Sequence, residues 1–320
     1  MKRIAFSAVI VLLAVHGVCG SEPLAATKTT AAAAVRSQLA AKPKTPPKVQ
    51  PVPAVQARPP YEAYAVADAA DGHVLEGLNV NLRWPQASLT KLMLAVVVID
   101  KLERGELRLT DRVAATKNSE KMGGTQVFLK AGETFTLEEL MKAALIESAN
   151  DAAYAVAEYA AGSSDKFVNL MNAKARALGM LDTEFHCVHG LPPAKGGADN
   201  ISTCSDMIRL AREALQHPQI LEWTSIEQTT FRSGTLVISN KNKLVGRVPG
   251  VDGLKTGYTR RAGFNIVATA KTGDRRLIVV VLGSPESRIR NGFATDKFRE
   301  HLLVQPAEPI EPVETAASGG

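Results

Sequence analysis

An apolar run from Leu92 to Ile99 limits the possible folds of this chain more than any other segment. The run ends at the polar Asp100, so it is long enough for a buried core helix but too short to cross a membrane. Pro85 stands just before it, and proline is tolerated at the edge of a helix but not inside one. The sequence therefore predicts a core helix that begins near Ser88, inside a folded domain.

Two polar residues at the start of this helix, Ser88 and Lys91, lie three positions apart and so share one helix face. Unpaired backbone N–H groups at the amino-terminal end of a helix favour developing negative charge. A serine, an amine that takes its proton and donors for an oxyanion are the components of acyl-transfer chemistry. The same spacing occurs at Ser163 and Lys166, where it predicts a helix cap with a solvated lysine. The spacing alone therefore does not identify a nucleophile.

The chain divides by composition into four parts. Residues 1–20 have a basic start, an apolar stretch and a small-residue end, which predicts a cleaved secretory signal peptide. Residues 21–60 are rich in Ala, Lys, Pro and Thr and predict a disordered linker, whereas residues 61–303 hold the large apolar side chains of a folded domain. Residues 304–320 predict a disordered tail, and no transmembrane segment is expected in the mature chain.

Charge and cysteine usage exclude several functions. The formal charge is +6, but the lysines are scattered and only 5% of residues are aromatic, so no nucleic-acid partner is expected. No Cys/His cluster has metal-ligand spacing and no glycine-rich phosphate loop occurs, so neither a metal nor another cofactor is expected.

Cys187 and Cys204 bracket a loop rich in Gly and Pro. In an oxidising compartment a disulfide between them is one hypothesis, and two buried thiols are the other.

The order of the expected elements predicts an α+β fold. A hairpin is expected over residues 63–75, with Asp71-Gly72 as its turn. Residues 110–216 have mostly helical patterns, interrupted by an irregular segment at residues 186–200. Strands and a closing helix follow, at residues 229–231, 236–238, 264–270, 277–282 and 287–303. We therefore expect an antiparallel sheet flanked by helices, together with a helical lobe.

Two further stretches carry polar groups at element boundaries. Ser148 and Asn150 stand where one predicted helix ends and the next begins; they either cap the second helix or face a cleft between lobe and sheet. The tripeptide Lys-Thr-Gly occurs twice. At residues 271–273 it lies between two apolar strands and predicts a turn. At residues 255–257 it lies in an extended segment of poor core character, where Gly257 allows close approach of another backbone or a ligand, unless the segment is a polar edge strand.

The three motifs at residues 88–91, 148–150 and 255–257 resemble, in this order, those of the penicillin-recognising serine acyl-transferases. The resemblance is closest to the low-molecular-weight penicillin-binding proteins that act as D-alanyl-D-alanine carboxypeptidases, and it covers residues 61–303. Further stretches that look like this family are residues 125–132, 161–162, 171–172, 178–180, 189–191 and 251–259. The resemblance implies a β-lactamase/transpeptidase-like fold and an enzyme of peptidoglycan metabolism. Such an enzyme is secreted across the inner membrane and is periplasmic or cell-wall associated.

The resemblance also implies catalytic roles. Ser88 would attack the penultimate D-alanine of a peptidoglycan stem peptide, release the terminal D-alanine and leave an acyl-enzyme that water hydrolyses. Lys91 would be the base, with the nearby cation Lys255 favouring its neutral form. Ser148 would relay a proton to the leaving amine. β-Lactam antibiotics would act as covalent inhibitors.

Substrate-binding roles follow from the same resemblance. Asn150 would orient the base and the substrate amide, and the backbone N–H groups of Ser88 and Tyr258 would hold the oxyanion. The substrate carboxylate would be bound by the lysine of the 255–257 motif, by Thr256 beside Gly257 and by Arg290, with Arg288 as the competing arginine. Tyr258 stands where some relatives have histidine.

Three alternatives remain open at this stage. A related endopeptidase would cut internal D-alanyl cross-links, for which the carboxylate site at Lys255 and Arg290 is not needed. A serine β-lactamase would need a glutamate for deacylation, and residues 186–200 contain none. A non-catalytic wall-binding protein would not acylate Ser88. Some relatives continue into a second domain with an amphipathic anchor; here the Pro/Glu tail predicts a single domain, soluble or held by its linker.

Overall fold

A computed structural model of the chain describes residues 59–193 and 196–303. The chain divides into two units, residues 1–56 and 57–320, and every described residue belongs to the second. The predicted signal peptide, nearly all of the linker and the predicted tail lie outside the described residues. Within these residues, no helix combines the length and the apolar character that a membrane span needs.

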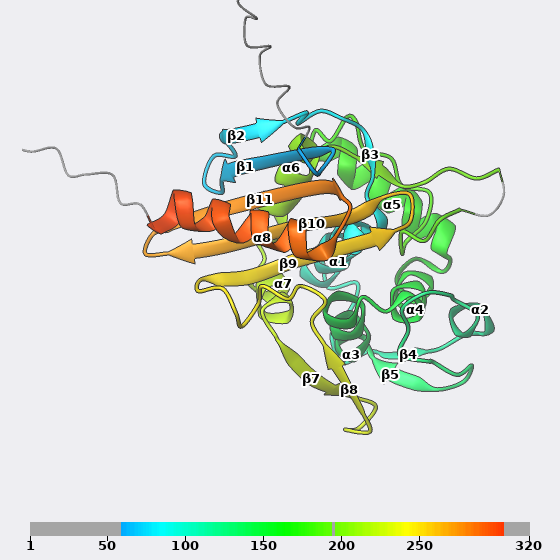
Figure 1. Cartoon of the computed structure of the whole chain (residues 1–320). Helices are drawn as coiled ribbons and strands as arrows, with labels where there is room; N and C mark the ends of the chain where they lie inside the picture. The colour runs from blue at the N-terminus through cyan, green and yellow to red at the C-terminus, as the bar shows by residue number, and fades with distance from the viewer. Residues whose placement is uncertain (1–58, 194–195, 304–320) are drawn as a thin grey trace, which may run out of the picture. The chain divides into compact units, whose positions relative to one another are not determined.

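A five-stranded antiparallel sheet forms the centre of the described unit (Figure 1). Its strand order is β2 (Val74–Leu78), β1 (Ala63–Asp68), β11 (Arg275–Ser284), β10 (Gly263–Thr272) and β9 (Val251–Thr259). The predicted hairpins β1–β2 and β10–β11 are both confirmed, and the pairing of β1 with β11 joins them into one sheet. The two ends of the folded chain are therefore held side by side.

Both faces of the sheet are covered, and strand β11 shows why. Its buried apolar side chains alternate in direction, as the period of a strand requires. Leu277, Val279 and Val281 pack with residues of α8 (Ser287–Phe298), while Ile278, Val280 and Leu282 pack with α1 (Thr90–Glu103) and α6 (Cys204–Leu215). Helix α8 lies on one side of the sheet, and α1 and α6 lie on the other (Figure 1).

The predicted core helix is confirmed as α1. A 3₁₀ turn, η1 (Ala87–Leu89), precedes it, and every residue from Thr90 to Ile99 is buried. This turn places Ser88 at the amino-terminal end of α1, as the proline before it predicted.

The helical lobe comprises α2 (Lys117–Glu120), α3 (Leu137–Lys142), the π-helix η2 (Ala143–Glu147), α4 (Asn150–Ala161) and α5 (Ser164–Ala177). Helix α3 begins with a capping box, the pattern of a threonine followed three residues later by a glutamate: Thr136 Oγ1 accepts from the N–H of Glu139 at 3.1 Å, and Glu139 Oε2 accepts from the N–H of Thr136 at 2.8 Å. The second Ser-x-x-Lys copy is also a cap, since Ser163 Oγ accepts from the N–H of Lys166 at 3.2 Å.

Several short elements were not predicted. They are the strand pairs β3 (Trp84–Pro85) with β6 (Ile201–Ser202) and β4 (Arg112–Ala114) with β5 (Thr134–Thr136), and the helix α7 (Pro218–Thr224). The predicted closing helix is present as α8 followed by the π-helix η3 (Arg299–Leu303). Two predicted strands, β7 (Gln228–Phe231) and β8 (Leu236–Ser239), are present but pair only with each other. Such short elements lack the repeated apolar pattern that makes longer ones recognisable.

Two sequence-based expectations are wrong. The segment around Lys255 was expected to have poor core character, yet β9 is buried over most of its length because η1 and α7 pack against it. The disulfide hypothesis also fails, because Cys187 and Cys204 are both free thiols. Cys204 is fully buried in the apolar core, where burial raises the pKa of its thiol, and Cys187 Sγ instead accepts from the N–H of Gly190 at 3.3 Å.

Candidate active site

Three segments that are far apart in sequence meet at one cavity of about 300 Å³. The turn η1, the junction of η2 with α4 and the edge strand β9 supply its centre. Helix α8 and the segment between β8 and β9 complete the wall. The lining residues are Ser88, Thr125, Ser148, Lys241, Lys243, Thr256, Gly257, Tyr258, Phe264, Ser287, Arg290 and Asn291.

Lys91 is completely buried beside Ser88. Its Nζ donates to Ser88 Oγ at 3.0 Å, to Asn150 Oδ1 at 2.7 Å and to the carbonyl oxygen of His189 at 2.8 Å. Burial lowers the pKa of this amine to about 7, because removal from water disfavours the charged form. A substantial neutral fraction at physiological pH is what a base for a serine hydroxyl requires.

Lys255 is the second buried amine, and its Nζ donates to Ser148 Oγ at 2.9 Å and to the carbonyl oxygen of Thr256 at 2.9 Å. Its pKa lies well below the usual range, first because of burial and then because of the positive charges of Lys91 and Arg290. The sequence-based hypothesis that Lys255 keeps Lys91 neutral is therefore corrected. Burial is the main cause of the low pKa of both amines, and the positive charge of Lys91 lowers the pKa of Lys255 further.

Ser148 has a left-handed backbone conformation, with φ at 66°. The capping interpretation of Ser148 and Asn150 is wrong, because α4 begins after Ala149 and no side chain caps it. Asn150 instead bridges two parts of the site. Its Oδ1 accepts from Lys91, and its Nδ2 donates to the carbonyl oxygen of Gly123 at 2.8 Å.

Two glycines from different chain segments pack closely against the backbone of the turn η1, which carries Ser88. A Cβ on Gly257 would lie 2.7 Å from the carbonyl oxygen of Gln86 and 3.0 Å from the nitrogen of Ser88. A Cβ on Gly190 would lie 2.0 Å from the carbonyl oxygen of Ala87. Only a residue without a side chain allows these close approaches. The prediction that Gly257 admits a neighbouring backbone is confirmed.

Arg290 lines the cavity and is only 4% exposed, whereas the side chain of Arg288 is 85% exposed on the surface. The guanidinium of Arg290 donates to Asn291 Oδ1 through Nε at 3.0 Å and Nη2 at 2.7 Å, and to the carbonyl oxygen of Asn265 through Nη1 at 3.1 Å. Because guanidinium has five N–H groups, two remain for a ligand. Burial lowers the pKa of Arg290 to about 10, so it stays cationic at neutral pH.

Tyr258 forms a partly open side of the cavity. Its side chain is 56% exposed, and its ring stacks on Phe264 with the centroids 4.2 Å apart. The backbone of Tyr258 follows Gly257 directly, so its N–H lies on the same stretch of β9 that approaches Ser88.

Sequence reasoning missed several parts of the site. The carbonyl oxygen of His189 accepts from both Lys91 Nζ and Ser88 Oγ, and burial, with the charge of Lys91, lowers the pKa of its imidazole to about 4. Asp151 accepts from the N–H groups of Val127 at 3.2 Å and Leu129 at 3.0 Å, which positions the loop that leads from Thr125. None of these residues stands in a motif of its own. Residues 125–132 and 189–191 were noted only as stretches that resemble the family, without a role for any of them in the site.

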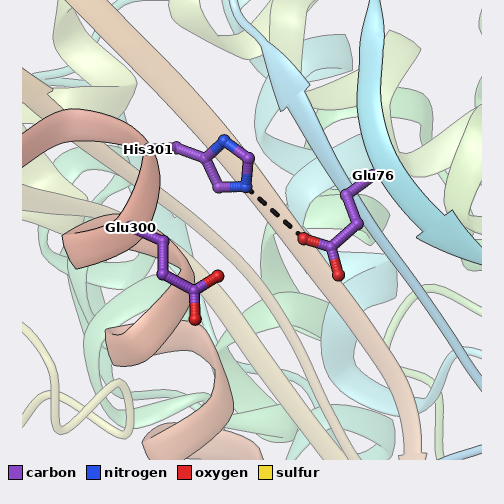
Figure 2. Close-up of side chains that lie close together, drawn as sticks. All are labelled: Glu76, Glu300 and His301. Carbon is purple, nitrogen blue, oxygen red and sulfur yellow. Dashed lines mark hydrogen bonds and ion pairs between the residues drawn. The ribbon is translucent and has the colours of Figure 1, made fainter. Parts of the chain in front are cut away.

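Among the residues that the structure describes, two clusters have metal-ligand groups within reach of one another, but in each a lysine ammonium contacts both carboxylates. In the first, Glu76 faces His301 at 3.4 Å with Glu300 beside them (Figure 2). Lys297 Nζ contacts Glu76 at 2.8 Å and Glu300 at 2.7 Å, which ties the closing helix to β2. In the second cluster, Asp100, Glu213 and His217, Lys174 Nζ contacts the two carboxylates at 3.0 and 2.7 Å. None of these residues lines the cavity.

Comparison with known proteins gives consistent results. Residues 50–286 match the S11 peptidase family model, described as D-alanyl-D-alanine carboxypeptidase. The D-alanyl-D-alanine carboxypeptidase DacC of Escherichia coli is 39% identical over 268 residues, which cover 80% of this chain and 65% of that protein. DacF of Bacillus subtilis is 35% identical over 252 residues, covering 76% of this chain and 64% of that protein. This chain therefore spans slightly less than two thirds of the length of both curated relatives.

Among solved structures, the fold is similar to that of penicillin-binding protein D2 from Listeria monocytogenes, which was determined with ampicillin and with cefotaxime bound. The TM-score is 0.68 at 31% identity, and the match covers 75% of this chain and 96% of that one. The expected transpeptidase-like α+β fold is thereby confirmed.

Proposed function

The chain belongs to the D-alanyl-D-alanine carboxypeptidase family of S11 peptidases, and from this premise we propose that it removes the terminal D-alanine from peptidoglycan stem peptides. The observation that carries the proposal is the buried amine of Lys91, which lies 3.0 Å from Ser88 Oγ and whose pKa is about 7. A nucleophile and a base in hydrogen-bond contact are the core of acyl transfer.

Acylation begins when neutral Lys91 takes the proton of Ser88 and the oxygen attacks the carbonyl carbon of the penultimate D-alanine. The three hydrogen bonds of Lys91, to Ser88, Asn150 and the His189 carbonyl, hold its Nζ in place. Backbone N–H groups of Ser88 and Tyr258 then stabilise the negative charge that develops on the carbonyl oxygen.

Departure of D-alanine needs a proton at its amine. Ser148 relays to this amine the proton that Lys91 took from Ser88, and Lys255, which donates a hydrogen bond to Ser148 Oγ at 2.9 Å, orients the relaying hydroxyl. Thr256 and the two unused N–H groups of Arg290 bind the terminal carboxylate. A substrate with a free C-terminus uses this site, which favours a carboxypeptidase over an endopeptidase.

β-Lactams are proposed to acylate Ser88 and to leave slowly. Among the described residues, no Asp or Glu lines the cavity, so a carboxylate that activates water for rapid deacylation is not in place. Of the acids in or near the irregular segment, Asp182, Glu184 and Asp199, the last two form ion pairs with Arg83 and Arg261. This argues against a serine β-lactamase. The predicted signal peptide supports a site of action in the periplasm or cell wall.

The test is incubation of the purified protein with diacetyl-L-Lys-D-Ala-D-Ala and, separately, with a cross-linked muropeptide. Release of D-alanine from the first supports the proposal, and cleavage of the second alone would assign an endopeptidase. Labelled penicillin should attach to the wild type and fail to attach to Ser88→Ala. If no label attaches to the wild type, a non-catalytic wall-binding protein becomes the better interpretation.

A further inference from the structure

The segment between β8 and β9 presents two lysines to the cavity, and neither belongs to the three motifs. Asn240, Lys241, Asn242 and Lys243 alternate along this segment. Both asparagines are buried, at 3% and 2% exposure, whereas both lysines line the cavity. The asparagines therefore face the protein and the lysines face the substrate.

Hydrogen bonds of the asparagines hold this segment rigidly. Asn240 Nδ2 donates to the carbonyl oxygens of Thr224 at 2.8 Å and Ile226 at 2.9 Å, and Asn240 Oδ1 accepts from the N–H of Asn242 at 2.8 Å. Asn242 Nδ2 donates to the carbonyl oxygen of Gly253 in β9 at 2.9 Å. The next residue after Lys243, Leu244, is buried in the core beneath α8. The backbone of Lys243 is thus fixed on both sides.

The two lysines differ in their charge partners. Lys241 forms an ion pair with Glu147, the residue before Ser148, so its charge is largely compensated. Lys243 is exposed, and within residues 59–193 and 196–303 no carboxylate or hydrogen-bond acceptor contacts its ammonium. Beside Arg290, the cavity wall therefore holds a second cation without a carboxylate partner among the described residues, on a stretch of backbone that is held in place.

The position of Lys243 places this charge on the leaving-group side of Ser88. Its neighbour Lys241 donates its backbone N–H to the carbonyl oxygen of Ile146 at 3.0 Å, and the charge of Lys241 contributes to the low pKa of Lys255. Asn242 is bonded to Gly253, five residues before Tyr258 on β9, which corresponds to about 16 Å of strand. The contacts of these two neighbours therefore place the backbone of Lys243 toward the Ser148 end of the cavity wall rather than toward Tyr258.

We propose that Lys243 determines specificity by binding a second carboxylate on the departing residue, so that stem peptides ending in an acidic D-amino acid are cleaved better than those ending in a neutral residue of the same size. The inference rests on the proposed function, because it assumes that the terminal residue leaves from this side. Arg290 and Thr256 bind the main-chain carboxylate, and the free ammonium of Lys243 binds the side-chain carboxylate. An isolated ion pair at a partly exposed site contributes modestly, so the preference is of the order of fivefold.

The test compares kcat/KM for diacetyl-L-Lys-D-Ala-D-Glu with that for its neutral counterpart ending in D-Gln. The wild type should prefer D-Glu about fivefold, mainly through KM, and the preference should shrink as salt is raised. Lys243→Gln should lose this preference and Lys243→Glu should reverse it; because the D-Glu to D-Gln ratio is taken within each variant, a change in overall activity does not affect the comparison. Lys271→Gln, which changes an exposed lysine outside the cavity, is the matched control and should behave as wild type.

Equal preferences in the wild type and Lys243→Gln would overturn the inference. So would a Lys243-dependent gain that appears only when the second carboxylate is moved to the donor residue, with diaminopimelate in place of lysine. Absence of any D-alanine release from diacetyl-L-Lys-D-Ala-D-Ala would instead refute the proposed function itself. Normal release without a D-Glu preference would refute only the role of Lys243.

Discussion

The two Lys-Thr-Gly copies lie on neighbouring strands of the same sheet and have opposite environments. Residues 255–257 of β9 are buried, and Lys255 Nζ contacts Ser148. Residues 271–273, at the end of β10 and in the turn to β11, are all exposed. The same three residues therefore form part of a site in one strand and a hairpin end in the next. The difference lies in the packing partner, because η1 covers β9 at this point and solvent covers the end of β10.

The two Ser-x-x-Lys copies repeat this contrast on helices. Lys91 is buried and bonded to the serine hydroxyl, whereas Lys166 is exposed and Ser163 caps α5. In both comparisons the reactive copy is the one whose amine has lost contact with water. Each pair therefore provides a matched control, since the same substitution can be made in both copies.

Replacing the serine should give the largest difference between copies. Ser88→Ala should reduce kcat on D-Ala-D-Ala peptide by about 10⁴-fold or more, because no nucleophile remains. Ser163→Ala should leave kcat unchanged and lower the free energy of unfolding by about 1 kcal/mol through loss of the cap. Steady-state kinetics and urea denaturation measure the two effects. Comparable kinetic losses in the two variants would remove the distinction.

Replacing the lysine of the Lys-Thr-Gly copies should give the next largest difference. Lys255→Met should reduce kcat/KM by about 10³-fold, since the proton path through Ser148 and a charge near the carboxylate site are both lost. Lys271→Met should have wild-type kinetics. Circular dichroism of both variants checks that the fold persists. Wild-type activity of a folded Lys255→Met would show that β9 is not part of the site.

The pH dependence should report the buried state of Lys91. Because burial lowers the pKa of this amine to about 7, its base form is lost as the pH falls below 7 and kcat/KM drops about tenfold per unit. At pH 5 the expected loss is about 100-fold relative to the alkaline plateau. Lys166→Gln should show the same profile as wild type. An acidic limb near pH 10 would mean that Lys91 is solvated like an ordinary lysine.

Replacing the glycine of each Lys-Thr-Gly copy by alanine should give the smallest difference between the two copies. Gly257→Ala pushes β9 away from Ser88, so kcat/KM should fall at least about tenfold. At Gly273 nothing lies within 4 Å of the added Cβ, but φ is +57°. Gly273→Ala should therefore cost about 1 kcal/mol of stability from backbone strain and leave kinetics unchanged. Thermal unfolding monitored beside the assay separates the two; a kinetically silent Gly257→Ala would contradict the close approach.

Local pattern was sufficient for most of the fold. The apolar run of α1, the capping box at Thr136, the turn at Asp71-Gly72 and the alternating strands β10 and β11 are properties of adjacent residues, so the sequence determined them by itself. The three motifs could also be recognised, because each is a short local string. The short strand pairs and α7 could not, since they are stabilised by neighbours that are distant in sequence.

Tertiary structure alone decided which copy of each motif is reactive and what surrounds it. The pKa of Lys91 is low because the side chain is buried among segments that are distant in sequence, including those of Asn150 and His189. No short stretch of sequence around Lys91 predicts that burial. The same holds for the free Cys187 and Cys204 and for Lys243 in the cavity wall. Local sequence sets backbone conformation and periodicity, whereas desolvation and charge pairing arise only when distant segments come together.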